Sequence, residues 1–263
     1  MTMPQRRKAQ SVCGLMALGV ACAAVGAFPA RAQETPAPKW EFSLTPYLWI
    51  AGVSGTLETR NARVPAQNVS ADFGDVLSHL NSIPVMGSAE VRYGRFGLSA
   101  DLMAISVKSD ISTRNVLFTG GSARLTQVIG SAVGSYRVVA GADQSLDLGI
   151  GVRAIGLSSK FTVNPGLLPG FERSPGVSWA NAIAAVRYHI DLAPDWGVTL
   201  YGDVGGGPSS AFTWQVFGTV DYRLSDSTSL RAGYRHLHFA YTGEVLKQSI
   251  ALSGPILGAT IRF

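Results

Sequence analysis

The chain has 263 residues, 46% of them hydrophobic, and its 22 Lys and Arg against 17 Asp and Glu give a formal net charge of +5. Four of the basic residues lie in the first 32 positions, which leaves 18 basic against 17 acidic residues in the rest, so nucleic acid is not a predicted partner. Both cysteines lie in the same segment, which excludes disulfides and cysteine-based metal sites from the remaining 231 residues.

Residues 1–32 have the pattern of a secretory signal peptide. A basic start is followed by an apolar stretch rich in Ala and Gly, and "ARA" then supplies small residues before a cleavage site. We predict cleavage between Ala32 and Gln33. The mature protein would consist of a short linker over 33–39 and one domain over 40–263.

Two other interpretations of this segment are less favoured. A membrane anchor would need a more hydrophobic core than this stretch, which is also followed by Pro29. Lipoprotein processing at Cys22 would need a Leu three residues earlier, and "GVAC" has none.

The rest of the sequence predicts about ten β-strands. Apolar and polar residues alternate through long segments, which is the period of a strand with one apolar face, and no stretch approaches the 18 apolar residues of a membrane-spanning helix. The strands are expected at 40–53, 82–93, 96–108, 123–139, 144–159, 178–191, 196–206, 211–224, 228–242 and 249–263.

The connections between these strands differ at the two ends. Short turns containing Gly, Asp, Pro or Ser are expected at 94–95, 141–143, 193–195 and 225–227, all on one side. Mostly longer connections fall on the other side, and "FGDVLSHL" in the first of them is expected to form a short helix. Short turns at one end and longer loops at the other are typical of outer-membrane barrels.

The alternation alone fits two folds, a soluble β-sandwich with the apolar face inside or a barrel with the polar face inside. Three features favour the barrel. The charged residues of the polar face are Arg, Asp and Glu, whereas a solvated sheet normally uses Lys freely. Aromatic residues gather at the short-turn end, as in an interfacial girdle, and the export signal supplies the compartment. We therefore predict an all-β, closed antiparallel transmembrane β-barrel of about ten strands, with eight or twelve as alternatives.

The polar face then defines a lumen in which Arg and carboxylates nearly balance. Since an unpaired buried charge is costly, this balance predicts a network of ion pairs that largely plugs the barrel. The predicted lumen network consists of Glu90, Arg92, Asp101, Arg137, Asp147, Arg153, Arg187, Asp191, Asp203, Asp221, Arg223, Arg231, Arg235 and Arg262.

The last strand alternates strictly and ends on an aromatic residue, through Leu257, Ala259, Ile261 and Phe263. This ending resembles the C-terminal assembly signal of Gram-negative outer-membrane proteins, which implies recognition by the barrel-assembly machinery. "TPYLWIAGVSGTL" and "GDVGGGPSSAFTWQVFGTVDYRLSDSTSLRAGYRHL" resemble a group of small, mostly uncharacterised proteobacterial outer-membrane β-barrel proteins. The resemblance implies a barrel of eight to twelve strands and assigns no reaction.

The residue types that carry catalysis or bind metals give no convincing site. His189 and Asp191 share the inner face near the short turns, where a hydrogen-bonding role inside the lumen is expected rather than activation of water. His236 and His238 are two apart on one strand, face outward, and are too few to bind a metal alone. We predict no catalytic residue, no cofactor and no metal site.

These observations predict a structural or envelope-maintaining protein of the Gram-negative outer membrane, most simply a monomer. A narrow pore for small solutes is the alternative, and an enzyme that modifies lipid A or cleaves peptides is the third candidate. Outer-membrane lipids and lipopolysaccharide are the expected partners. Basic residues on the loop side could meet their phosphates, although acidic residues on the same side favour a merely solvated rim; the basic residues are Arg60, Arg63, Lys108, Arg114, Arg124, Lys160, Arg173 and Lys247.

Overall fold

The computed structural model describes residues 39–59, 67–111, 118–207, 211–243 and 246–263. The predicted signal peptide and its cleavage site lie outside the described residues, as do the loop residues Arg60, Arg63 and Arg114. No helix in the described part of the chain is long and apolar enough to cross a membrane.

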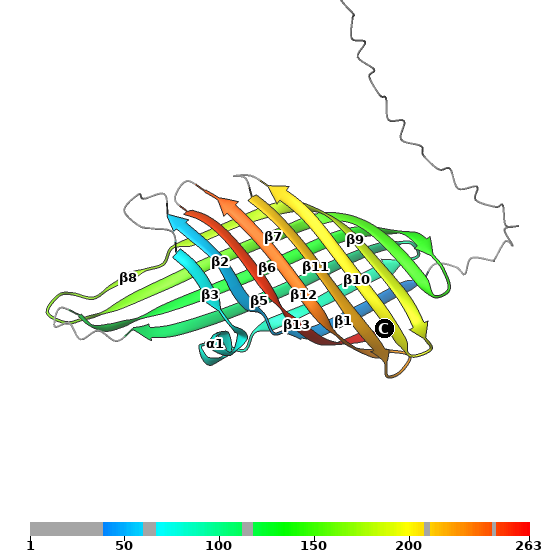
Figure 1. The fold of residues 1–263 in the computed structure, drawn as a ribbon, viewed down its shortest axis with the longest axis horizontal. Helices are drawn as coiled ribbons and strands as arrows, with labels where there is room; N and C mark the ends of the chain where they lie inside the picture. Colours follow the sequence, from blue (N-terminus) through cyan, green and yellow to red (C-terminus); the bar gives the residue numbers. More distant parts are fainter. Residues whose placement is uncertain (1–38, 60–66, 112–117, 208–210, 244–245) are drawn as a thin grey trace, which may run out of the picture. The chain divides into compact units, whose positions relative to one another are not determined.

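Ten antiparallel strands form a closed barrel in the described residues, which confirms the predicted fold (Figure 1). The ring closes because β1 pairs with β4 on one side and with β13 on the other. In ring order the strands are β1 (Trp40–Trp49), β4 (Val85–Tyr93), β5 (Phe96–Ile111), β6 (Phe118–Ala140), β7 (Gln144–Pro165), β9 (Gly176–Ala193), β10 (Trp196–Gly207), β11 (Ala211–Arg223), β12 (Thr228–Thr242) and β13 (Leu246–Arg262).

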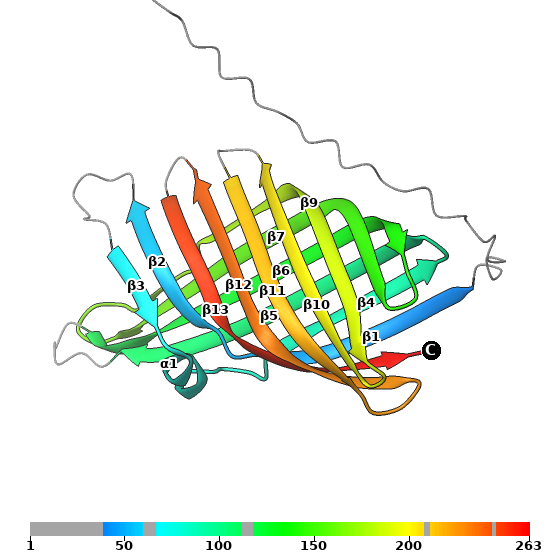
Figure 2. The ribbon, with the colours of Figure 1, turned by 45° about the vertical axis from the view of Figure 1, so that its right-hand side comes forward.

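The strands are staggered around the ring. Pairings followed from Ser43 in β1 through every strand in turn reach Gly55, which is 12 residues further along the same part of the chain. Such a stagger makes the strands incline to the barrel axis, as Figures 1 and 2 show. It also brings together inside the barrel residues that are far apart in the sequence.

The first predicted strand, 40–53, is interrupted at Ile50 and Ala51. Beyond this break β2 (Gly52–Thr59) stays in register with β13 and takes β3 (Gln67–Ala71) as its other neighbour. The outer half of β13 has no part of β1 opposite it, and β2 satisfies its backbone hydrogen-bonding groups instead. The predicted loop between the first two barrel strands therefore contains an additional hairpin.

The short helix in that loop forms over α1 (Phe73–Ser78), and Asp72 caps it by accepting a hydrogen bond from the Asp75 backbone at 2.9 Å. The strands β5, β6, β7 and β13 extend further from the short turns than predicted, and β8 (Phe171–Arg173) adds a short pairing to β7. Lys108 and Lys160 consequently lie within strands, whereas Lys247 is the second residue of β13.

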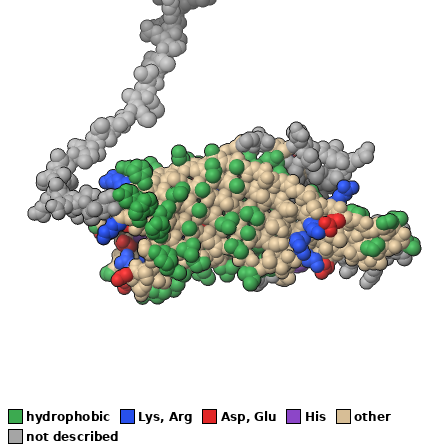
Figure 3. All heavy atoms as spheres, turned by 180° about the vertical axis from the view of Figure 1, so that it is seen from behind, with side chains coloured by type: hydrophobic (Ala, Val, Ile, Leu, Met, Phe, Trp, Pro, Cys, Tyr) green, Lys and Arg blue, Asp and Glu red, His purple; other side chains and the backbone are tan. Residues whose placement is uncertain are grey.

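The outer wall of the barrel is apolar. Alternate side chains such as Leu148, Ile150 and Val152 on β7 are 48–77% exposed, and Figure 3 shows hydrophobic side chains spread over the wall. An exposed apolar wall on a closed sheet suits hydrocarbon, in which every backbone group must be paired internally.

Aromatic rings line this wall at the short-turn end. Pairs of them touch across neighbouring strands, with ring centroids 4.8 Å apart for Trp40 and Tyr93 and 4.8 Å apart for Trp196 and Tyr222. This arrangement resembles the aromatic girdle that membrane-spanning barrels place at an interface.

Candidate functional site

The candidate functional site is the lumen, into which the polar faces of the strands point. Asp147 is 3% exposed, whereas its neighbour Leu148 is 48% exposed on the outer wall. The buried charged residues include Arg92, Asp147, Arg153, Asp203, Asp221 and Arg235. Because each of these charges leaves water on folding, each needs a partner inside the barrel.

Asp147 and four other charged side chains form a cluster in the half of the lumen near the short turns. We call Glu90, Arg92, Arg137, Asp147 and Arg187 the Asp147 cluster. Arg92, Arg137 and Arg187 each place a guanidinium nitrogen 2.8–2.9 Å from an Asp147 oxygen, and Arg92 and Arg187 also pair with Glu90. Three arginines thus share two carboxylates, which leaves this cluster with one excess positive charge.

A second ion pair lies deeper in the barrel, between Arg153 on β7 and Asp203 on β10. Two parallel hydrogen bonds of 2.8 and 2.6 Å join the guanidinium to the carboxylate, and both side chains are 0% exposed. Arg153 also donates to Thr213 at 3.0 Å and to Ser131 at 3.1 Å. The pair is therefore both fully desolvated and well supplied with hydrogen bonds.

Arg235 on β12 links several strands across the lumen at a neighbouring level. It donates to Asp101 at 2.8 Å, to the Tyr47 hydroxyl at 2.8 Å and to the Gln215 carbonyl oxygen at 2.7 Å. Its guanidinium also lies 4.7 Å from the centre of the Trp49 ring. Gln215 in turn donates to Asp203, so that Arg235 and the Arg153–Asp203 pair belong to one network.

Further from the short turns than Arg235, large apolar side chains face the lumen. Trp49, Ile129, Ile155, Leu237 and Phe239 are each at most 2% exposed and belong to a single packed cluster with neighbouring inward-facing hydrophobic residues. Along β12 the order from the turn is Arg231, Arg235, Leu237 and Phe239, so charged layers and an apolar layer follow one another. Together these layers fill the central part of the barrel.

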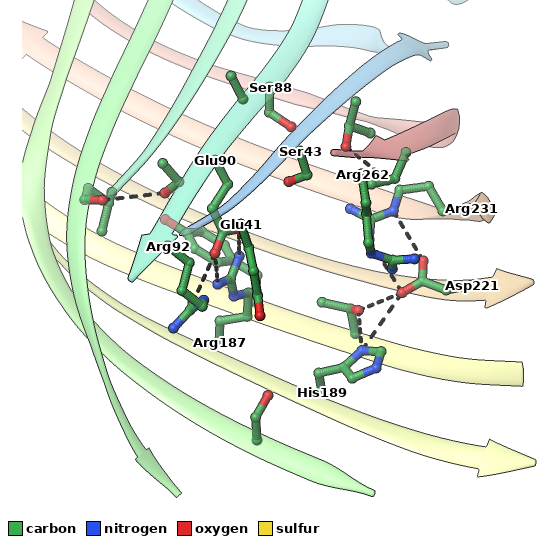
Figure 4. Close-up of a pocket in the computed structure, with 18 of the residues that line it drawn as sticks. Glu41, Ser43, Ser88, Glu90, Arg92, Arg187, His189, Asp221, Arg231 and Arg262 are labelled. Atoms are coloured by element: carbon green, nitrogen blue, oxygen red, sulfur yellow. Dashed lines mark hydrogen bonds and ion pairs between the residues drawn. The ribbon is translucent and has the colours of Figure 1, made fainter. Parts of the chain in front are cut away.

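A cavity of about 470 Å³ remains at the short-turn end (Figure 4). It is lined by charged side chains from several strands, including Glu41, Glu90, Arg187, Asp221 and Arg262. Arg262 has no ion-pair partner among the described residues, and Arg223 lies 3.9 Å from Asp191 with half of its side chain exposed. Arg223 and Arg262 are thus the least tightly held arginines of the predicted lumen network.

A hydrogen-bonded chain runs along one wall of this cavity. Thr199 donates to Asp221 at 2.6 Å, and Asp221 also accepts from Arg231 at 3.1 Å. Since the Thr199 hydroxyl gives its proton to Asp221, it accepts one from His189 Nδ1, which lies 2.9 Å away. The other imidazole nitrogen lies 3.3 Å from Asp191. His189 therefore takes part in the lumen network.

Several members of the lumen network were not predicted from the sequence. Tyr47, Thr199, Thr213 and Gln215 are uncharged, and their inward position in the strand alternation was the only signal that could have found them. Such polar residues complete the hydrogen bonding of the buried charges, because a guanidinium has more donors than one carboxylate can accept.

The two histidines of β12 face outward as predicted. His236 lies 2.6 Å from the Ser253 hydroxyl and His238 lies 3.1 Å from the Ser249 hydroxyl, both across the β12–β13 pairing. The Trp214 ring is 4.6 Å from the His236 ring. No group of three or more His, Cys, Asp or Glu that could hold a metal ion occurs in the described part of the chain.

Comparisons with known proteins give distant likenesses to several solved structures. No protein-family model matches the chain, and no curated protein matches it. The toluene transporter TodX of Pseudomonas putida is 9% identical, with 86% of this chain and 90% of that chain covered and a TM-score of 0.31. Ail, the attachment invasion locus protein of Yersinia pestis, is 10% identical, with 85% and 98% covered and a TM-score of 0.33.

The transport unit of the autotransporter AIDA-I from Escherichia coli is 9% identical to this chain, with 90% and 93% covered and a TM-score of 0.38. Such low identities and scores do not indicate what the chain does.

Proposed function

We propose that this protein is a closed outer-membrane β-barrel with a structural, envelope-maintaining role. The observation that carries the proposal is the succession of filled layers across the lumen, above all the fully buried pair of Arg153 and Asp203. A solute crossing this level would have to separate the two charges, and an unpaired buried ion costs several kcal/mol. The protein then acts through its surfaces and its presence in the membrane rather than as a transport path.

The proposed location rests on the outer wall of the barrel and on the predicted signal peptide. The apolar wall with its aromatic girdle suits a bilayer, and the predicted signal peptide directs export. The short turns would face the periplasm and the long connections the outside. A monomer is the simplest form, since the ring closes within one chain.

The purified protein is expected to give no steady ion conductance in planar bilayers, because its lumen is filled by paired charges and apolar side chains. A sixteen-stranded porin in the same bilayer serves as the positive control. Regular conductance steps from the wild-type barrel would overturn the closed-lumen proposal.

A narrow pore for small solutes is the second candidate, and the cavity of about 470 Å³ favours it. Such a pore would need Arg235 to move aside, because this residue joins Asp101, Tyr47 and Gln215 across the lumen above the cavity. If the wild-type protein conducts, the variant Arg235→Ala should conduct more. If the apolar layer also blocks the lumen, the Arg235→Ala variant should give no conductance.

Deleting Phe263 is expected to lower the amount of protein in the outer membrane more than the stability of the folded barrel. The Phe263 side chain is 76% exposed, so it packs little inside the protein, although its backbone donates a hydrogen bond to Phe42 at 2.9 Å. Its resemblance to the assembly signal would make it a recognition point before the barrel closes.

The measurement compares outer-membrane abundance in cells with refolding of purified chain into detergent micelles, and Phe263→Tyr serves as the control that keeps an aromatic end. Normal insertion of the truncated chain in cells would remove the assembly role. Equal failure in both assays would assign Phe263 to the barrel structure alone.

A further inference from the structure

Three basic residues stand side by side on the outer wall, at the end far from the short turns. Lys108 on β5 is paired directly with Arg124 on β6, and Arg124 is paired directly with Lys160 on β7. All three have the outward parity of their strands, like Val128 and Val152, which are exposed on the wall. We call these three residues the cation row. Figure 3 shows basic side chains gathered where the hydrophobic part of the wall ends, with acidic side chains beside them.

Like charges placed directly opposite each other destabilise a sheet. A negative group bound between the three residues would relieve this repulsion. The two outer members have one each: Lys108 lies 3.0 Å from Asp110, and Lys160 lies 2.9 Å from Glu172. These four side chains are 38–76% exposed, so the pairs are weakly held and screened by water. The central Arg124 is exposed and has no ion pair or hydrogen bond from its guanidinium to any described residue.

The surface below the cation row changes in two steps toward the membrane core. Two residues nearer the short turns, the same strands present the hydroxyls of Ser106, Thr126 and Ser158, again paired directly across the three strands. Ser106 and Thr126 are hydrogen-bonded at 3.1 Å. Two residues further, Ala104, Val128 and Gly156 begin the apolar part of the wall. The order is thus apolar wall, hydroxyl row, cation row.

This order matches that of a phosphorylated lipid standing beside the barrel. Acyl chains contact apolar residues, polar ester and sugar groups lie at the level of hydroxyls, and phosphates lie beyond them, where basic side chains are favoured at membrane surfaces. A guanidinium also binds phosphate through two parallel hydrogen bonds, which an ammonium does not offer.

We propose that the cation row binds the phosphate of an outer-leaflet lipid head group, with Arg124 as the central ligand and Lys108 and Lys160 on either side. The proposal rests on the proposed orientation of the barrel in the outer membrane. It replaces the expectation of a merely solvated rim, because the strand register aligns three cations that the sequence separates by 16 and 36 residues.

The test uses the purified, folded barrel in zwitterionic detergent micelles, with diphosphoryl lipid A as the probe and dephosphorylated lipid A as its matched comparison. Lipids retained on the protein are counted by native mass spectrometry over a lipid titration. The phosphorylated probe is expected to bind at least about tenfold more tightly, since charge-assisted hydrogen bonds to phosphate are lost with the dephosphorylated one. Added salt should weaken only the binding of the phosphorylated probe.

The variant Arg124→Gln is expected to lower the affinity for diphosphoryl lipid A about tenfold or more, and to leave folding unchanged because the side chain is exposed. Lys247→Gln is the matched control. Lys247 lies on the same rim, but it is paired with Glu58 at 3.2 Å and has no second cation opposite it.

Equal binding of the two lipids, or equal loss of affinity in the two variants, would overturn the proposal. If millimolar inorganic phosphate competed as effectively as the lipid, the cation row would be assigned to free phosphate. That result would overturn the proposal that the ligand is a lipid. The assay uses purified protein, so fractionation of the barrel away from the outer membrane would refute the proposed location without changing these results.

Discussion

Replacing Arg153 with alanine is expected to lower the free energy of unfolding of the barrel by about 3–5 kcal/mol. The change would leave the Asp203 carboxylate in a site where both partners of the pair are 0% exposed. Asp203 would keep the 3.3 Å hydrogen bond from Gln215, but that amide cannot neutralise its charge. Unfolding by urea in detergent micelles or lipid vesicles measures the difference.

The matched control is Arg223→Ala, which removes an arginine from the same face of the barrel. Its guanidinium is half exposed and 3.9 Å from Asp191, so the expected loss is within about 1 kcal/mol. Equal losses in the two variants would show that the Arg153 site is open to water.

The double variant Arg153→Met, Asp203→Leu separates the loss of the ion pair from the stranding of a single charge. Hydrophobic side chains of similar volume often replace a buried pair with little loss of stability. The double variant is therefore expected to be more stable than Arg153→Ala alone. A double variant as unstable as the single one would mean that the hydrogen bonds to Thr213 and Ser131 carry the stability instead.

Replacing Gly254 with alanine is expected to weaken the closing seam of the barrel. A Cβ atom at this position would overlap the Ile50 backbone oxygen and would lie 3.0 Å from the Ala51 Cα. These atoms belong to the break between β1 and β2, where Ile50 donates a backbone hydrogen bond to Pro255 at 2.9 Å. Because backbone atoms rather than a flexible side chain oppose the methyl group, the strands must separate there.

The expected loss for Gly254→Ala is at least about 2–3 kcal/mol, the upper range for overpacked sites. Mobility on gels before and after heating, which distinguishes closed from unfolded barrels, gives the fraction closed at each temperature. Gly134→Ala on the outer wall is the control, since a Cβ there meets only the Ile150 oxygen at 3.9 Å. A closed fraction in Gly254→Ala equal to that of the control at every temperature would contradict the account of the seam.

The sequence by itself determined the class of structure and the two faces of its wall. Alternation of residues such as Asp147 and Leu148 depends only on the local geometry of a strand, in which neighbouring side chains point in opposite directions. The same local logic located the short turn at Gly94, whose φ of 57° suits glycine, and the strand count of ten. It also indicated that arginines and carboxylates would share the polar face.

Only the tertiary structure decided which of these residues meet. Arg187 pairs with Glu90 across 97 positions, and Arg153 pairs with Asp203 across 50. These partners depend on the stagger of 12 residues around the ring. The stagger is set when β13 pairs with β1, and the sequence of a single strand does not indicate it. The cation row has the same origin, because only the register of three strands places Arg124 between Lys108 and Lys160. Pairing across a closed sheet is a long-range property, and a period of two along the chain does not encode it.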